Sequence, residues 1–284
     1  MTRGPRPEEG SEGDTTHDRG RIPVALTIAG SDSGGGAGIQ ADLKTFEAFG
    51  VFGTSAITAV TAQNTRGVTA IAVLEPAVIT AQIRAVCEDL APRASKTGML
   101  ANAAGVLATA GALREMGLSP VVVDPVMVAT SGDRLLEADA LAALRDELLP
   151  LAALVTPNVP EAELLLGRAL PDAAALPDAA RELADLGPGG VLLKGGHLPG
   201  GEIVDVGWDG KELREFRARR IETTSTHGTG CTLSAAIAAG LALGWDLWTA
   251  IETGIGYTRR AIAAAPGLGG GNGPLRHRIP VEEG

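Results

Sequence analysis

Short apolar runs alternate with amphipathic segments along most of this chain. The runs are rich in β-branched residues and have the length of strands, whereas the amphipathic segments repeat apolar residues at helical spacing. Glycine and proline mark several boundaries, as at Gly50 and Pro76. The pattern predicts strands at 24–29, 54–61, 68–73, 94–99, 120–124, 153–156 and 190–194, a hairpin of 202–208 with 213–218, and helices at 37–49, 76–90, 101–116, 135–149, 159–166, 178–186, 230–243 and 247–265.

The middle strands are apolar at nearly every position, which indicates that both of their faces are covered. Runs such as VVVD and VLLK are typical of parallel strands between two layers of helices, so we expect an α/β fold with a largely parallel central sheet. Because no repeat or linker interrupts this pattern, we expect one domain at 21–270, a disordered leader at 1–20 and a tail at 271–284. Ligands of such folds bind at the carboxyl ends of the strands.

The composition argues against several classes of protein. A net charge of −10 and an aromatic content of 3% lack the positive face and the stacking residues of a nucleic-acid binder. The uncharged stretch 223–245 is apolar only in its second half, which is shorter than the roughly 20 residues of a membrane span. Two cysteines cannot build a disulfide framework, and the first 20 residues match neither a secretory signal nor a transit peptide. We therefore expect a cytoplasmic protein without a membrane or nucleic-acid partner.

A glycine-rich loop follows the first predicted strand. Its sequence Gly36-x-Gly38-x-x-Ala41 matches a loose dinucleotide-binding fingerprint, but residues 57–63 lack the carboxylate that this fingerprint requires for the ribose. A nicotinamide enzyme is therefore disfavoured. The alternative is that the glycines allow the first helix to pack closely against the sheet.

A second loop of small residues precedes a long helix near the C-terminus. Gly228, Thr229 and Gly230 lie where the amides of the helix N-terminus attract negative charge, which favours an anion-binding loop over an ordinary Thr/Gly-rich loop. Cys231 falls in the first turn, where we expect the helix dipole to stabilise its thiolate. The alternative for this residue is a buried structural cysteine.

Polar residues follow several of the predicted strands. Asn158 and Glu161 can hold Mg²⁺ at a helix entry, or they can form a helix-capping pair. Asp124 and Lys194 each end a buried strand, where the lysine can reach a phosphate, cap a helix or pair with the aspartate. Gln63 also ends a strand, and its amide can pair with the edge of a heteroaromatic ring or satisfy the backbone.

Eight segments together resemble the hydroxymethylpyrimidine/phosphomethylpyrimidine kinases of thiamine biosynthesis, which belong to the ribokinase-like superfamily. The resemblance implies a three-layer α/β/α ribokinase-like fold and a homodimer. It also implies that ATP, with Mg²⁺, phosphorylates 4-amino-5-hydroxymethyl-2-methylpyrimidine and then its monophosphate. The segments are GGGAGIQADLKTF (34–46), AITAVTAQNTRGV (56–68), KTGML (96–100), VVVDPVM (121–127), SGDRLL (131–136), TPNVPEAELL (156–165), LLKGGH (192–197) and STHGTGCTLSAAIAA (225–239).

The same resemblance implies roles for the candidate residues. Asn158 and Glu161 would organise Mg²⁺ around the ATP phosphates, with Asp124 close to the same groups. Lys194 would neutralise phosphate charge, and Thr229 would contribute to nucleotide binding. The pyrimidine would pair with the side-chain amide of Gln63. Four further residues would enclose the ring, namely Asp42, Gly30, Met99 and Val126.

Residues 228–231 resemble the anion hole that faces the transferred phosphoryl group. Cys231 stands where most of the superfamily has an aspartate base, a variant typical of the pyrimidine-kinase branch. If its pKa is lowered, Cys231 would assist deprotonation of the substrate alcohol, and Cys231→Ser would cut turnover about 10²-fold. Two other functions stay open. The first is a pyridoxal kinase or an enzyme that accepts both rings, and the second is a non-catalytic module that senses the pyrimidine. Residues 131–135 are a candidate mobile cover of the site.

Overall fold

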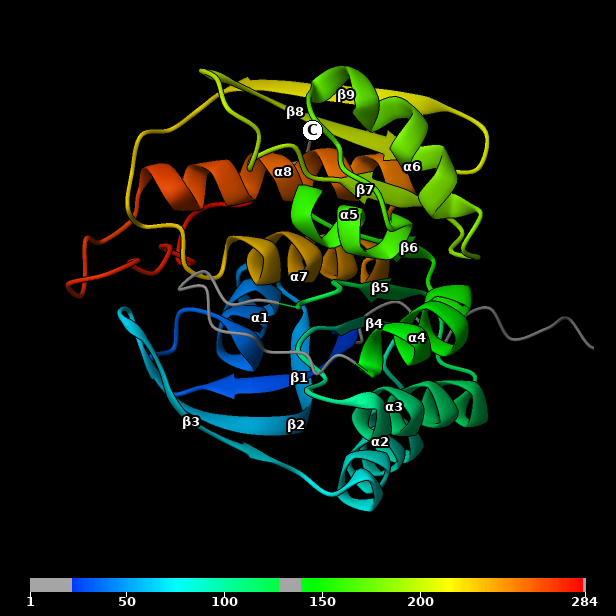
Figure 1. The fold of residues 1–284 in the computed structure, drawn as a ribbon. Coiled ribbons are helices and arrows are strands. Elements are labelled where there is room, and N and C mark those ends of the chain that lie inside the picture. Colours follow the sequence, from blue (N-terminus) through cyan, green and yellow to red (C-terminus); the bar gives the residue numbers. More distant parts are fainter. Residues whose placement is uncertain (1–21, 128–138, 283–284) are drawn as a thin grey trace, which may run out of the picture.

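The computed structural model describes residues 22–127 and 139–282 (Figure 1). The expected leader at 1–20 and the candidate cover at 131–135 lie outside the described residues. The strands are β1 Val24–Asp32, β2 Phe52–Asn64, β3 Gly67–Val73, β4 Ala94–Thr97, β5 Val121–Val123, β6 Leu154–Val155, β7 Val191–Leu193, β8 Glu202–Trp208 and β9 Leu213–Arg219. The helices are α1 Gly38–Ala48, α2 Pro76–Leu90, α3 Ala103–Met116, α4 Ala140–Ala143, α5 Val159–Leu166, α6 Leu176–Ala184, α7 Thr229–Ala242 and α8 Leu247–Ala263.

The strands form one sheet in the order β3-β2-β1-β4-β5-β6-β7-β8-β9. All neighbours from β2 to β7 pair in parallel, whereas β3, β8 and β9 pair antiparallel at the two edges. The prediction of an α/β fold with a largely parallel sheet is confirmed. The carboxyl ends of the six parallel strands therefore meet along one edge of the sheet.

Helices cover both faces of this sheet, which gives the expected three layers (Figure 1). Along β5, Val121 and Val123 join the core that includes α2, α3 and α6, whereas Val122 joins the core that includes α7 and α8. Successive side chains of a strand point to opposite faces, so both faces of β5 must be apolar. This is the physical reason for its unbroken run of valines. Among the described residues, no helix is long and apolar enough to cross a membrane.

The helix expected at 135–149 has a different form in its described part. The α-helical geometry of α4 ends at Ala143, a π-helical turn follows at Leu144–Leu148, and a 3-10 turn follows at Leu149–Leu151. Pro150 lies in this last turn, and proline does not continue an α-helix because it lacks the amide hydrogen.

The C-terminal segment is packed against the domain, contrary to the boundary expected at residue 270. Leu275 and His277 are buried. The Arg276 amide donates to the Ala261 carbonyl on α8, and the Tyr257 hydroxyl donates to the His277 carbonyl at 2.6 Å. Residues 271–282 are therefore part of the folded unit that contains the site.

Candidate active site

One cavity of about 1090 Å³ lies at the carboxyl ends of the parallel strands. It extends from the end of β2 to the start of α7 and onward between β9 and α8. Almost all candidate residues line it, although they come from distant parts of the sequence. They are Gly30, Gln63, Met99, Asp124, Val126, Asn158, Glu161, Lys194, Gly228, Thr229, Gly230 and Cys231.

The anion-binding loop predicted before α7 has a tightly constrained backbone. Gly228 is the N-cap of α7 and has a φ of 82°, a left-handed conformation that favours glycine. A Cβ atom at this position would collide with the carbonyl oxygen of Gly36 in the other glycine-rich loop. The two loops are therefore in direct backbone contact, and the N-terminus of α7 faces the cavity.

A hydrogen-bonded pair of side chains that the sequence analysis missed joins these two loops. His227 Nε2 lies 2.9 Å from Asp32 Oδ2, and both side chains are buried. The carboxylate of Asp32 also accepts hydrogen bonds from the amides of Gly34, Gly36 and Ala37 at 2.7–3.0 Å. Burial opposes ionisation of Asp32, but the hydrogen bonds from His227 and these amides lower its pKa below the ordinary value.

The function of the first glycine-rich loop follows from these contacts. The amides that would cradle a dinucleotide phosphate are instead used to bind the Asp32 carboxylate. This arrangement argues further against a nicotinamide site and gives Gly34 and Gly36 a structural role in binding Asp32, which lines the cavity. The local signal for Asp32 was present, because an aspartate that follows a buried strand needs partners.

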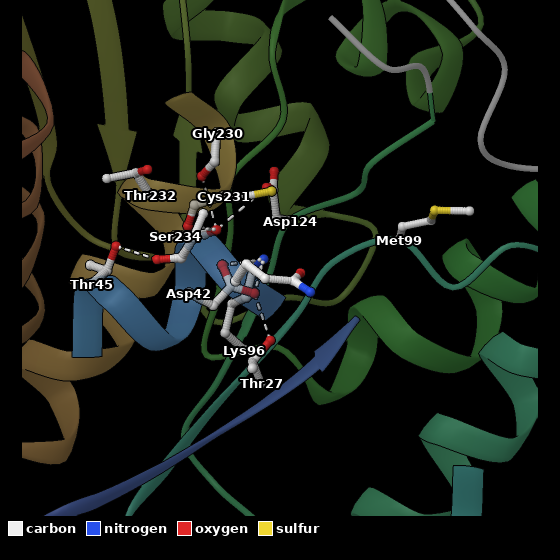
Figure 2. A network of polar contacts seen from close by, with 12 residues as sticks. Thr27, Asp42, Thr45, Lys96, Met99, Asp124, Gly230, Cys231, Thr232 and Ser234 are labelled. Carbon is white, nitrogen blue, oxygen red and sulfur yellow. Dashed lines mark hydrogen bonds and ion pairs between the residues drawn. The ribbon is translucent and has the colours of Figure 1, made fainter. Parts of the chain in front are cut away.

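Cys231 lies in the first turn of α7, as expected, but the expectation of a stabilised thiolate is wrong. Burial raises the pKa of its thiol to about 11, and nearby Asp42 and Asp124 add to this rise. The positive charge of Lys96 opposes the rise but does not reverse it. Near neutral pH the side chain is a thiol, and Figure 2 shows it beside Asp124.

Asp42 does not line the cavity, contrary to its expected role in enclosing the substrate. Its side chain is fully buried, and its two carboxylate oxygens each lie 3.0 Å from Lys96 Nζ, whose side chain is also fully buried. The Thr27 hydroxyl donates to the same carboxylate at 2.6 Å (Figure 2). Burial would lower the pKa of Lys96, but the adjacent Asp42 carboxylate raises it above the ordinary value. Lys96 was not among the predicted residues, although a lysine within a buried strand is a signal for a charged partner.

Asp124 and Lys194 meet inside the cavity, although 70 residues separate them in the sequence. Lys194 Nζ lies 3.2 Å from Asp124 Oδ1, and the Ser234 hydroxyl donates to the other carboxylate oxygen at 3.3 Å. A Cβ atom on Gly230 would lie 3.3 Å from Lys194 Nζ and 3.4 Å from Asp124 Oδ2. A small residue at 230 thus keeps this charged pair next to the first turn of α7.

Asn158 and Glu161 form the capping box that the sequence offered as an alternative to metal binding. Asn158 Oδ1 accepts from the Glu161 amide at 2.9 Å, and Glu161 Oε2 accepts from the Asn158 amide at 2.8 Å. Burial raises the pKa of Glu161 to about 7; Lys194 opposes this rise and Asp124 adds to it. The capping role is therefore observed, and it orients both side chains at the wall of the cavity.

The acidic residues of this wall are compatible with Mg²⁺. The described residues contain no group of three or more His, Cys, Asp and Glu side chains placed to hold a metal ion by themselves. Mg²⁺ does not require such a group, because it commonly binds one or two carboxylates together with water and phosphate oxygens. Asp124 and Glu161 supply two carboxylates on one cavity wall.

One end of the cavity combines apolar walls with the amide of Gln63. Met99 and Val126 pack there in a small apolar cluster, and a Cβ atom on Gly30 would lie 3.1 Å from the Met99 sulfur. Glycine at position 30 therefore leaves room beside the methionine. The end suits a small flat ring with a polar edge.

The other end of the cavity lies between β9 and α8 and was not predicted. Its lining combines apolar side chains from β9, α7, α8 and the loop after β9 with charged side chains, which include Glu215, Arg217, Glu252 and Arg259. The sequence pattern alone did not identify this end, because apolar residues at helical or alternating spacing are also expected where elements simply pack together. The apolar side chains are Phe216, Ile221, Leu233, Ile255 and Ile262.

Comparisons with known proteins agree with this geometry. The family model described as phosphomethylpyrimidine kinase matches residues 32–276. A hydroxymethylpyrimidine/phosphomethylpyrimidine kinase of Rhizobium meliloti is 55% identical over 257 residues, which cover 89% of this chain and 96% of that protein. The crystal structure of a phosphomethylpyrimidine kinase from Clostridium difficile is 44% identical with a TM-score of 0.76, and the match covers 84% of this chain and 99% of that one. An ADP complex of Bacillus subtilis pyridoxal kinase is 37% identical with a TM-score of 0.84, over 90% of this chain and 98% of that one.

Proposed function

Because this chain belongs to the phosphomethylpyrimidine kinase family, we propose that it transfers the γ-phosphoryl group of ATP to 4-amino-5-hydroxymethyl-2-methylpyrimidine and then to the resulting monophosphate. One observation carries the proposal. A single cavity joins the amide-bearing apolar end at Gln63 to the anion loop 228–231 and to the pair of Asp124 and Lys194. A pyrimidine alcohol and a nucleotide triphosphate can therefore meet within it.

The chain's own groups act mainly by positioning and by charge. Phosphoryl transfer passes through a loose transition state that spreads negative charge over the phosphoryl oxygens. The amides at the start of α7 and the ammonium of Lys194 would stabilise this charge from fixed positions. Asp124 and Glu161 would hold Mg²⁺, which when bound neutralises phosphate charge. The capping box supports this assignment, because it fixes Glu161 toward the cavity.

Cys231 is better suited to position the substrate alcohol than to remove its proton. A thiol with a pKa of about 11 is protonated near neutral pH, so it can approach the alcohol without adding negative charge. The alcohol proton would then pass late in the reaction to an oxygen of the transferred phosphoryl group, as the bond from the alcohol oxygen to phosphorus forms and the bond from phosphorus to the ADP oxygen breaks.

The apolar end between β9 and α8 is the candidate site for the adenine ring. Phe216, Ile255 and Ile262 supply a surface for a flat base, and Arg259 lines the same end. The same cavity connects this end to the anion loop and to Lys194, so the triphosphate would extend along it from the adenine toward Lys194. Pockets of this composition, with a few polar groups, are typical of small-molecule sites.

A pyridoxal kinase is the second candidate, because the pyridoxal kinase of Bacillus subtilis shares this fold at 37% identity. The two are separated by measuring ADP release from MgATP with the pyrimidine, with its monophosphate and with pyridoxal. We expect both pyrimidines to be phosphorylated, with a kcat/KM at least about tenfold above that for pyridoxal, which corresponds to roughly 1.4 kcal/mol. If neither pyrimidine causes release of ADP, the proposal is refuted.

A matched pair of lysine variants excludes a contaminating kinase. Lys194→Met should abolish turnover, whereas Lys211→Met, at an exposed lysine in the β8–β9 turn, should leave it unchanged.

The homodimer and the cytoplasmic location expected from the sequence stay predictions.

A further inference from the structure

Thr61 contacts the amide of Gln63 from the same strand, β2. Thr61 Oγ1 lies 3.0 Å from Gln63 Oε1 and 3.0 Å from the carbonyl oxygen of Ser31. Thr61 is buried, with 4% of its surface exposed, and all three residues line the cavity. The hydroxyl therefore connects the amide to the backbone at the end of β1.

The backbone of Gln63 is fixed independently. The Ser33 hydroxyl donates to the backbone carbonyl of Gln63 at 2.7 Å and accepts from the backbone N–H of Gln63 at 2.8 Å. Gln40 on α1 holds the neighbouring segment, since its side-chain amide donates to the Ser31 hydroxyl at 2.7 Å and its oxygen accepts from the Asp32 amide at 2.9 Å. With the backbone held in this way, the remaining freedom of Gln63 is in its side chain.

A carboxamide presents an acceptor on one side and a donor on the other, and a half-turn of its last bond exchanges them. We propose that Thr61 is a positioning residue that holds the Gln63 amide in one of these two orientations and thereby selects the 4-aminopyrimidine edge. The proposal rests on the proposed function, in which Gln63 pairs with this edge. The buried Thr61 hydroxyl distinguishes the two orientations, because its one hydrogen is shared between the Ser31 carbonyl oxygen and the amide oxygen that the structure places beside it.

The consequence for substrate choice follows from the chemistry of the ring. A 4-aminopyrimidine offers a donor, the amino group, next to an acceptor, the ring nitrogen. The corresponding 4-oxo ring offers the reverse order, an acceptor oxygen next to a ring N–H. One amide orientation fits the first edge and the flipped orientation fits the second. The substrate hydroxymethyl group is attached next to position 4, so the same selection keeps it directed toward the anion loop.

The test compares Thr61→Val with Thr61→Ser, using the 4-amino substrate and its 4-oxo analogue in calorimetric binding and steady-state kinetics. Thr61→Val keeps the side-chain shape but removes the hydroxyl. We expect the KM for the 4-amino ring to rise about tenfold, with kcat changed less than about twofold, while the affinity for the 4-oxo ring is unchanged or improved. Thr61→Ser should restore the wild-type preference to within about threefold.

Thr54→Val is the matched control. Thr54 lies on the same strand, is buried and donates its hydroxyl to the Ala25 carbonyl at 2.9 Å, but it does not line the cavity. We expect this variant to keep the wild-type preference between the two rings.

Three results would overturn the proposal: an unchanged preference in Thr61→Val, an equal weakening for both rings, or the same change in Thr54→Val. If Thr61→Val does not fold, the preference of Thr61→Ala decides in its place. Failure of the proposed function is a different result, because the wild type would then not phosphorylate the pyrimidine at all. If Gln63→Ala loses the pyrimidine while Thr61→Val keeps the preference, only the role of Thr61 fails.

Discussion

At the residue scale, the site depends on charged groups that lie out of contact with water. Asp42 and Lys96 form a pair with both side chains at 0% exposure, next to the cysteine at the start of α7. Such a pair is costly to bury, but removing one partner is costlier because it leaves an isolated charge in the interior. We therefore assign this pair a role in holding the site together.

Lys96→Met should lower the free energy of unfolding by about 3–5 kcal/mol, because it leaves the Asp42 carboxylate buried without its partner. The double variant Lys96→Met/Asp42→Asn should recover most of this loss, since no net charge stays buried. Urea denaturation measures both. Arg84→Met, which breaks the exposed ion pair with Glu115, should have a far smaller effect. A double variant as unstable as Lys96→Met alone would contradict this explanation.

The reactivity of Cys231 tests its environment directly. With a pKa of about 11, its alkylation by iodoacetamide near pH 7 should be about 10²-fold slower than that of an ordinary thiol with a pKa near 8.5. The rate should still rise about tenfold per pH unit above pH 9. Mass spectrometry of the Cys87→Ser protein measures it, with the same protein in urea as reference. A rate that levels off near pH 8 would show that the thiol is activated.

At the scale of elements, the candidate anion loop at 228–231 is held by contacts between segments that are distant in sequence. The loop before α7 packs against the loop before α1, through the Gly228 backbone and through the pair of His227 and Asp32. The parallel strand β1 leads into the loop before α1, whereas the loop before α7 follows the antiparallel edge strand β9, and the two helix entries support each other where these loops meet. The close approach of the backbones requires glycine at the point of contact.

Gly228→Ala should reduce kcat/KM at least about 10²-fold while the protein stays folded. The added Cβ meets the Gly36 carbonyl, and the left-handed backbone disfavours alanine, so the loop must shift. A displacement of about 1 Å is enough for such a loss of rate. Steady-state kinetics and thermal unfolding measure the two effects. Gly111→Ala on α3, where an added Cβ meets nothing within 4 Å, should leave kcat/KM unchanged; wild-type activity in Gly228→Ala would contradict the constrained loop.

At the scale of the whole molecule, the C-terminal segment closes the structure behind the site. The Gly273 carbonyl accepts from the His227 amide at 3.1 Å, and His277 Nε2 lies 3.0 Å from Thr232 Oγ1 in the first turns of α7. Burial lowers the pKa of His277 to about 4. The segment thus couples the end of the chain to the anion loop, and its stability depends on pH.

The pH dependence follows from the proton balance of His277. The unfolded chain binds a proton near pH 6.5 and the folded chain only near pH 4, so acid favours unfolding. The stabilisation by neutral His277 is complete above pH 6.5 and is lost as the pH falls toward 4, by roughly 3 kcal/mol. His277→Gln should remove this part of the acid sensitivity in urea denaturation between pH 4 and 7. If the free energy of unfolding falls equally with pH in the wild type and in His277→Gln, this role of His277 is contradicted.

Much of the site was predictable because each of its residues has a local signal. Asp124 and Lys194 end apolar strands, Asn158 and Glu161 open a helix, and glycines mark the anion loop. What the pattern could not resolve was the use of each group. Asp42 was expected in the substrate pocket, yet its carboxylate is turned to Lys96 on β4, because burial of either charge requires the other. The C-terminal segment was expected to be a tail because glycines precede it, yet Leu275 and His277 within it are buried.

By itself, the sequence determined the order of strands and helices, the parallel sheet with two covered faces, and the family. Hydrophobic periodicity and helix-entry residues are local properties, so they can be read along the chain. Only the tertiary structure decided that His227 pairs with Asp32 across 195 residues, that Cys231 is a half-buried thiol with a raised pKa, and that a pocket opens between β9 and α8. Burial and pairing depend on which surfaces meet, and that is set by packing rather than by neighbours in sequence.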